Sequence, residues 1–115
     1  MPAAAESADG PMIVFHGTFR IEPDRMDEAL EHAERLVRET NEEPGVVDYR
    51  IARDVVDDHT LRFFEQYENE AAVDHHTETP HVRAFSEALP DLLAAEPTLT
   101  QFEVADVSER DLGGA

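Results

Sequence analysis

Segments of two-residue hydrophobic alternation and segments of helical spacing follow one another in a set order along this chain, and that order restricts its fold most. Residues 12–21 alternate, with Ile13, Phe15, Phe19 and Ile21 on one side, which is typical of a strand with one buried face. From Pro23 to Thr40 the apolar positions recur every three or four residues. This spacing predicts a helix that ends before the turn at 43–45.

The second half of the chain repeats this alternation of types. Two short strands, 46–53 and 61–68, are separated by a polar stretch, which predicts a hairpin with a longish loop. Asn69 is a suitable N-cap for a helix from Glu70. Pro80 should kink or break that helix before it continues.

The remaining segments complete the pattern. Residues 82–89 continue the second helix, 91–95 form one more helical turn between two prolines, and 98–107 alternate as a last strand. The order is therefore β-α-β-β-α-β. It predicts an α+β, ferredoxin-like split βαβ fold, with an antiparallel sheet and both helices on one face.

Parity along each strand assigns side chains to the face under the helices or to the open face. Under the helices we expect Ile13, Phe15, Phe19, Val47, Tyr49, Ile51, Phe102 and Val104. On the open face we expect Val14, His16, Thr18, Arg20, Asp48, Arg50, Gln101 and Glu103. The third strand is ambiguous. Because a carboxylate is costly against the helices, we assign Phe63, Glu65 and Tyr67 to the open face.

A mixed aromatic and polar sheet face is more often an interface or a pocket wall than bare surface. The simplest cover is a second copy of the chain, sheet against sheet. This predicts a homodimer through the open face.

The charge of the chain excludes some partners. The formal net charge is −18, and all nine basic residues are Arg. Nucleic acid is not an expected partner, because phosphates are neutralised by clustered basic residues. Many acids without any Lys indicate a halophilic microbe, since concentrated salt screens self-repulsion.

Other classes follow from what the sequence lacks. The chain has no Cys, so no disulfide or thiolate metal site is possible. No membrane span or signal peptide is recognisable, so we expect a soluble, cytoplasmic protein. Residues 1–11 are expected to be a flexible leader, 12–107 the folded domain and 108–115 a flexible tail.

A histidine cluster at 75–81 is the unusual chemical feature. On an unbroken helix His76 and His81 would not share a face, although a kink at Pro80 could change that. No carboxylate follows at helical spacing, as it does in HExxH. We therefore expect no metal, and packing or helix-end hydrogen bonds are the alternative roles.

Three runs carry a family resemblance: Glu43-Pro-Gly45 followed by Tyr49, then 64–71, then 72–85 with His76 and His81. Together, over residues 12–107, they resemble the antibiotic biosynthesis monooxygenase (ABM) domain, with a quinol monooxygenase-like pattern. The resemblance implies a dimeric α/β barrel with a cavity between sheet and helices in each subunit. It also implies oxidation of quinols or polyketide anthrones by dioxygen with no cofactor.

Such a reaction needs a base, an electron-rich anion and a dry pocket. His16, His76 and His81 are the candidate bases, and Glu65 could orient a histidine or a substrate hydroxyl. The candidate contacts for a small aromatic substrate are Tyr67, Phe85, Arg50 and Phe63.

Other interpretations remain open. Glu65 could pair with an Arg across the dimer, and His76 and His81 could serve only the helix start and its kink. The chain could be a non-catalytic dimeric module that binds a small ligand or serves a stress response. A haem-degrading branch of the same family uses an Asn, a Trp and a His ligand, which fall near His16, His76 and Ser86. Without a Trp, and with Ser at the ligand position, that function loses its anchor.

Overall fold

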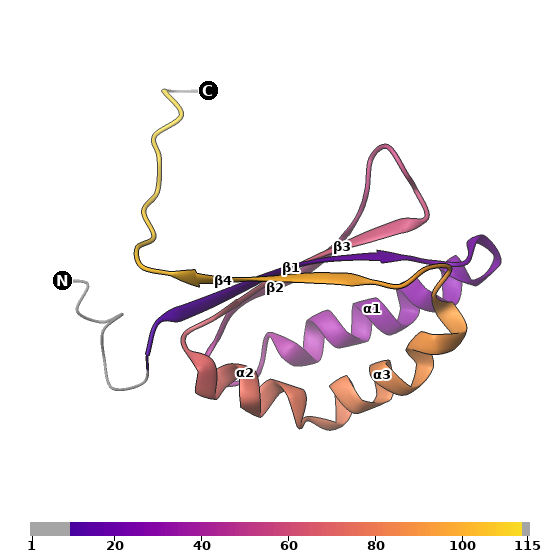
Figure 1. The fold of residues 1–115 in the computed structure, drawn as a ribbon, viewed down its shortest axis with the longest axis horizontal. Coiled ribbons are helices and arrows are strands. Elements are labelled where there is room, and N and C mark those ends of the chain that lie inside the picture. Colours follow the sequence, from indigo (N-terminus) through magenta and orange to yellow (C-terminus); the bar gives the residue numbers. More distant parts are fainter. Residues whose placement is uncertain (1–9, 114–115) are drawn as a thin grey trace.

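The computed structural model describes residues 10–113 of the chain. Figure 1 shows one sheet with all helices on one of its faces. The strands are β1 (Met12–Arg20), β2 (Val46–Arg53), β3 (Thr60–Tyr67) and β4 (Thr98–Val104). The helices are the short 3-10 turn η2 (Pro23–Arg25), α1 (Met26–Thr40), α2 (Glu70–Thr77) and α3 (Pro80–Leu92).

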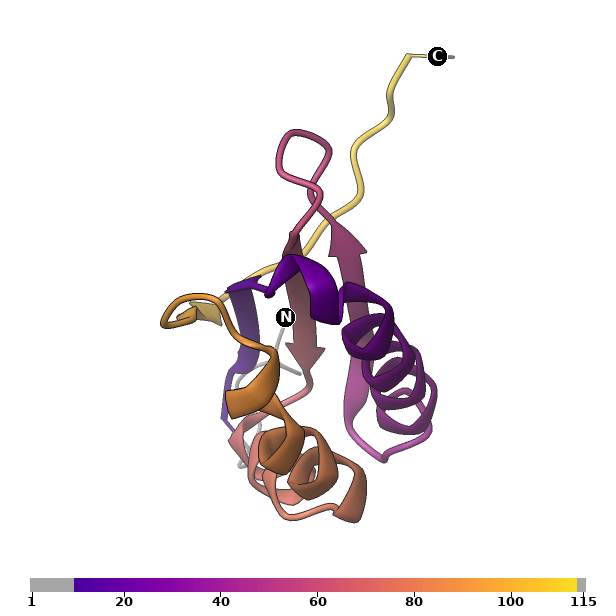
Figure 2. The same cartoon turned by 90° about the vertical axis from the view of Figure 1, so that its right-hand side faces the viewer.

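The sheet is antiparallel throughout and has the order β2-β3-β1-β4. This is the ferredoxin-like arrangement, so the predicted fold class is confirmed. Figure 2 shows α1 on the side of β2 and α3 toward the other edge, with the two helices next to each other.

Helix α1 forms where the spacing predicts it. Its buried residues recur at three- and four-residue steps and face the sheet: Met26, Ala29, Ala33, Leu36 and Thr40. On the solvent side Arg38 pairs with Glu34, and Arg35 pairs with Glu39. Exposed pairs of this kind each contribute only a few tenths of a kcal/mol, about 0.3–0.5.

The predicted break in the second helix is confirmed. Asn69 caps α2, accepting a hydrogen bond from the Ala72 amide. Thr79 caps α3, and Pro80 occupies its first turn, where a missing N–H is tolerated. The prediction of a separate helical turn over 91–95 was wrong, because α3 runs through Pro90 to Leu92.

The expected face of β3 was also wrong. Phe63, Glu65 and Tyr67 lie under the helices, with exposed fractions of 2%, 8% and 0%. Register supports this placement, since Phe63 pairs with Ile51 and Glu65 with Tyr49 on the same face. The open face instead carries Phe64, which is 40% exposed.

The expected faces of β4 are reversed. Phe102 pairs with Val14 and Val104 with Met12, so both lie on the open face. Gln101 and Glu103 therefore lie on the helix side, where they remain exposed because β4 is an edge strand. Val47 was expected under the helices but is 48% exposed, since a register shift falls between Val46 and Asp48.

Outside β1 and β4, the described terminal residues 10–11 and 105–113 contain no helix or strand. The leader expected for 1–11 lies mostly outside the described residues, as do the last two residues of the expected tail. None of the helices described for residues 10–113 is long and apolar enough to span a bilayer.

Candidate active site

A cavity of about 230 Å³ lies between the sheet and helices α1, α2 and α3. Its walls are mostly apolar and aromatic, and Thr77, Ser86 and Leu99 are its exposed lining residues. The titratable groups in its lining come from β2, β3 and α2: Tyr49, Glu65, Tyr67 and His76. The family resemblance implied a cavity in this position.

Among the described acidic side chains, only Glu43 and Glu65 are buried, each 8% exposed. Carboxylates are almost never fully buried unless they are paired. Both belong to this region of the molecule, Glu65 in the cavity wall and Glu43 behind His76. The two buried acids therefore indicate where the site lies, whereas the other described acids lie at the surface.

Glu43 is held by the turn that joins α1 to β2. Gly45 has a φ of +85°, a conformation that favours glycine, and a Cβ at this position would lie 2.6 Å from the Cβ of Ala72. The Gly45 carbonyl accepts a 2.8 Å hydrogen bond from the Glu68 amide. The Glu-Pro-Gly turn thus packs directly against α2 and fixes the carboxylate beside the histidines.

His76 and His81 both contact Glu43. Nδ1 of His76 lies 3.1 Å from Oε2 of Glu43, and Nε2 of His81 hydrogen bonds to the same oxygen. The break at Thr79 places the last turn of α2 and the first turn of α3 on one carboxylate. The possibility that a kink at Pro80 brings these two histidines together is therefore confirmed.

Glu43 was missed as a site residue by reasoning from the sequence, which used the Glu-Pro-Gly run as a turn and as part of the family resemblance but gave the carboxylate no role. The carboxylate lies 33 residues before His76, so no local spacing connects them. The ligand atoms of Glu43, His76 and His81 lie within 4.8 Å of one another. One cation could bridge that spacing, and hydrogen bonds connect the three side chains in the structure.

The protonation of His76 follows from its surroundings. A carboxylate only accepts hydrogen bonds, so Nδ1, which faces Glu43, carries the proton and Nε2 has the lone pair. Burial lowers the pKa of His76 below its usual value, and the hydrogen bond to Glu43 opposes that shift in part. A neutral imidazole held in one tautomer is suited to accept a proton.

Glu65 has the opposite tendency. Burial raises the pKa of its carboxyl group, while the 2.7 Å hydrogen bond from the Tyr67 hydroxyl lowers it in part. Burial also raises the pKa of Tyr67 and of Tyr49, and the charge of Glu65 contributes to both shifts. A carboxyl group shifted toward its protonated form and a histidine shifted toward its neutral form are a matched acid and base.

The structure brings together most, but not all, of the predicted site residues. Phe63, Tyr67 and Phe85 line the cavity with Glu65 and His76. His81 lies behind His76, with ring centroids 6.3 Å apart.

His16 and Arg50 are not part of this arrangement. Both are exposed and lie on the open face, where they are register partners of Phe64 on β3. Arg50 pairs with Asp48 at 3.1 Å. Strand alternation places both on the open face, as expected, and they do not line the cavity with His76, so the structure does not join the candidate base His16 and the candidate contact Arg50 to this site.

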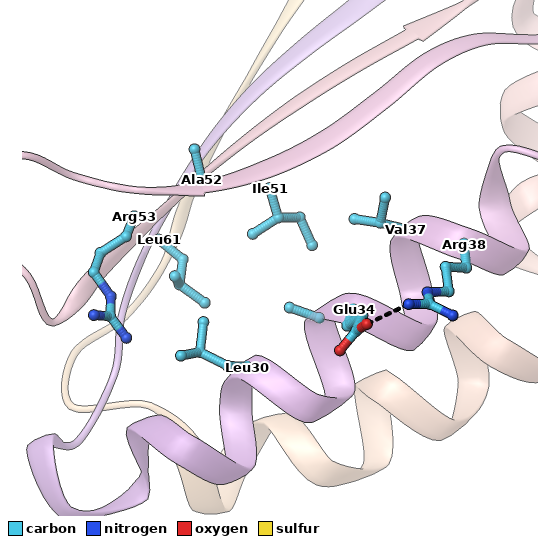
Figure 3. Close-up of a pocket in the computed structure, with 9 residues that line it drawn as sticks. Leu30, Glu34, Val37, Arg38, Ile51, Ala52, Arg53 and Leu61 are labelled. Atoms are coloured by element: carbon cyan, nitrogen blue, oxygen red, sulfur yellow. Dashed lines mark hydrogen bonds and ion pairs between the residues drawn. The ribbon is translucent and has the colours of Figure 1, made fainter.

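A second hollow, of about 420 Å³, lies between α1 and the edge strand β2 (Figure 3). Its floor is apolar, with Leu30, Val37, Ile51 and Leu61, and the Glu34–Arg38 ion pair borders it. Its lining includes no histidine and no buried acid. For acid and base chemistry, the cavity at His76 is the better candidate.

The comparisons agree with this picture. The family model described as antibiotic biosynthesis monooxygenase matches residues 12–88. An uncharacterized protein from Synechocystis sp. is 32% identical over 108 residues, which cover 91% of this chain and 73% of that protein. The Bacillus subtilis protein named "Putative monooxygenase YcnE" is 28% identical over 95 residues, covering 83% of this chain and 100% of its own. The solved structure of Rv0793 from Mycobacterium tuberculosis has a TM-score of 0.80 at 20% identity, covering 85% of this chain and 99% of that one.

Proposed function

Because the chain belongs to the antibiotic biosynthesis monooxygenase family, we propose that it oxidises a small aromatic quinol or related phenol with dioxygen, without a metal or flavin. The observation that carries this proposal is the apolar cavity whose lining includes both a histidine and a buried carboxyl group. His76, neutral and fixed by Glu43, lies on one wall, and Glu65 with its raised pKa lies on another.

In this mechanism Nε2 of His76 takes the phenolic proton of the bound substrate. The resulting anion is electron-rich and reduces dioxygen in a cavity whose apolar walls restrict water. One oxygen atom enters the ring and the other leaves as water, so a hydroquinone plus O2 gives a hydroxyquinone plus H2O. All electrons come from the substrate, and Glu65, in its protonated form, can donate a hydrogen bond to a developing carbonyl oxygen.

The aromatic side chains of the cavity wall indicate the class of substrate. Phe63 and Phe85 lie in the cavity with ring centroids 5.9 Å apart, and Phe19 lies 4.3 Å from Phe63. Aromatic walls of this kind favour a flat ligand through offset and edge contacts. The volume of about 230 Å³ favours a small one.

The proposal includes a homodimer through the open sheet face. Phe64 is 40% and Phe102 50% exposed there, beside Val14. In Figure 1 the β2–β3 loop and residues 105–113 both leave the sheet on the side away from the helices, so they flank this face. A second copy, sheet against sheet, would cover the aromatic side chains.

The working environment is proposed to be a salt-rich cytoplasm. The support is the net charge of −18, the use of Arg without any Lys, and the exposure of most described acids outside the site. Concentrated salt screens repulsion between such surface charges.

Oxygen uptake tests the enzymatic proposal. The protein is mixed anaerobically with a panel of quinols, and air is then admitted. We expect uptake above the uncatalysed rate for at least one quinol, and a fall of at least about a hundredfold in His76→Ala, since a positioned base contributes that much. Glu65→Ala should also be slower, whereas His59→Ala, on the β2–β3 loop, is the matched histidine control.

The same experiment separates the alternatives. If every quinol is bound but recovered unchanged, the chain is a small-ligand-binding module and the oxygenase proposal is wrong. Haem degradation is not favoured, because Ser86 lies at the position of the ligand and is not among the usual axial ligands of haem iron.

A further inference from the structure

The cluster of Glu43, His76 and His81 has a further polar contact, from His81 to Glu39. Nδ1 of His81 lies 3.3 Å from Oε1 of Glu39 in the last turn of α1. The side chain of Glu39 is 43% exposed, whereas those of Glu43, His76 and His81 are 5%, 9% and 11% exposed. A continuous series of polar contacts therefore runs from the cavity wall to solvent.

We propose that His76, Glu43, His81 and Glu39 form a proton relay that connects the cavity with solvent, with Glu39 as the exit group. The proposal rests on the proposed function of His76 as the base and adds the route by which the cavity loses and regains its proton. It assigns roles to Glu43 and Glu39, which do not touch the ligand and therefore act as positioning and relay residues.

His81 lies between a buried and an exposed carboxylate. Both of its ring nitrogens face carboxylates, Nε2 toward Glu43 and Nδ1 toward Glu39. In its doubly protonated form His81 donates to Glu43 through Nε2, while its Nδ1 lies 3.3 Å from Oε1 of Glu39 in an ion-pair contact. The positive charge on that ring is then held between two negative charges, only one of which is buried.

The relay carries one proton from the ligand to solvent. The ligand gives one proton to Nε2 of His76, and the Nδ1 proton of His76 moves to Glu43. Once Glu43 is neutral, the buried charge that held the His81 cation is gone, so His81 releases its Nδ1 proton to Glu39 and water. One proton enters, one leaves, and no electron moves.

The reverse direction resets the site. When water forms in the cavity, Nε2 of His76 gives its proton to the leaving oxygen, and Glu43 returns a proton to Nδ1. His81 then regains a proton from solvent through Glu39. The lowered pKa of His76 fits this scheme, since a buried imidazolium tends to pass its proton on.

Two other charged groups face these residues. Nδ1 of His75 lies 3.7 Å from Oε1 of Glu43, which is too long for a hydrogen bond. Arg35 donates a 2.9 Å hydrogen bond to Oε2 of Glu39 and leaves Oε1 for His81. The contacts therefore favour His81 and Glu39 as the exit over His75.

Stopped-flow mixing with 4-nitrophenol tests the relay without turnover. The phenolate colour reports proton transfer from the bound ligand, and a pH indicator in weak buffer reports proton release to solvent. In the wild type both signals should appear together. In Glu39→Gln the phenolate should still form, while proton release slows by about tenfold or more and recovers when a small exogenous base is added.

Glu34→Gln is the matched control, because Glu34 lies on the same helix, is exposed and pairs with Arg38 instead of a histidine. Equal release rates in Glu39→Gln and wild type would overturn the relay and leave the base assignment intact. Absence of phenolate in the wild type would overturn both. One equivalent of a transition metal in the purified protein, lost in Glu43→Ala, would also overturn the relay, since a cation would occupy the position of its protons.

Discussion

The Tyr67 hydroxyl donates a 2.7 Å hydrogen bond to the Glu65 carboxylate, and both side chains are buried on the helix-covered face of the sheet. They are neighbours two residues apart on β3, so strand alternation places them side by side. The hydroxyl provides the partner that makes a carboxylate tolerable there. The balance between burial and this single hydrogen bond sets the protonation of Glu65.

Replacing Glu65 by Gln should increase stability at neutral and higher pH. The folded pKa of Glu65 is raised above its unfolded value, so its contribution to stability is fully present below about pH 4.3 and is lost as pH rises through the folded pKa. Gln does not titrate. We therefore expect Glu65→Gln to be more stable than wild type at high pH and to differ little from it at low pH. Urea unfolding across the pH range measures the difference.

Tyr67→Phe should shift Glu65 in a known direction. The Tyr67 hydrogen bond lowers the pKa of Glu65, so its removal should raise that pKa further and move the loss of stability to higher pH. Carboxyl carbon NMR on both proteins reports the titration directly. A lower pKa for Glu65 in Tyr67→Phe would contradict the assignment.

Truncation of Glu43 should destabilise the fold. Glu43→Ala leaves Nδ1 of His76 and Nε2 of His81 without their acceptor, and a buried unpaired donor costs about 1–3 kcal/mol. Glu43→Gln keeps one acceptor oxygen and should lose less. Both are compared by urea unfolding at one salt concentration and pH. Equal stability of Glu43→Ala and wild type would mean that the contact contributes nothing.

His76 should titrate below an unperturbed histidine, whose pKa is about 6.5. Because its folded pKa is lowered, its contribution to stability is present above the unfolded pKa and is lost as pH falls through 6.5 toward the folded pKa. Proton NMR of the ring gives the midpoint, and quinol oxidation should decline on the acid side of that midpoint. Glu43→Gln removes the negative charge that raises this pKa, so the midpoint should fall further.

The turn at Gly45 offers a purely structural test. Gly45→Ala combines a positive φ of +85° with a Cβ 2.6 Å from that of Ala72, and strain of the first kind alone costs about 1–3 kcal/mol. We expect a lower Tm and displacement of Glu43 from His76, seen as a changed His76 titration. Gly113→Ala is the control, since it has φ +73° but no atom within 4 Å of its Cβ.

The open face predicts a change in mass. Phe64→Asp should convert a dimer into a monomer in concentrated salt, because Phe64 is 40% exposed on the central strand β3. Light scattering coupled to size exclusion measures the mass. Ala71→Asp, at an exposed residue of α2 on the helix-covered side of the sheet, should stay dimeric. A monomeric wild type would remove the dimer from the proposal.

Much of the fold could be predicted because periodicity and caps are local signals. Asn69, Pro80 and the spacing within α1 each act over a few residues, and all are where the sequence placed them. The predicted face of β3 was wrong because Glu65 was treated as an isolated charge. Its partner, Tyr67, was visible two residues away but had been assigned to the same wrong face.

The site was only partly predictable for a related reason. His76 and His81 were found by residue type, and the bend that joins them was considered. Glu43 was not found as their partner, because the contact depends on the Gly45 turn packing against Ala72, a tertiary event without a sequence period. The predicted faces of β4 were wrong because this edge strand has no buried side. Its sequence therefore has no hydrophobic alternation that indicates which residues face the helices.

The cavity wall is shared between α3 and the other elements of the fold, and this has an evolutionary consequence. Helix α3 contributes Val82, Phe85, Ser86 and Leu89 to the cavity, and only Leu92 of this helix is fully buried. The proton-handling groups in the cavity wall come from other elements. Substitutions along one helix can therefore remodel the shape of the ligand pocket while its acid and base stay in place. A scaffold of this kind can diversify in what it accepts without first losing the chemistry that it performs.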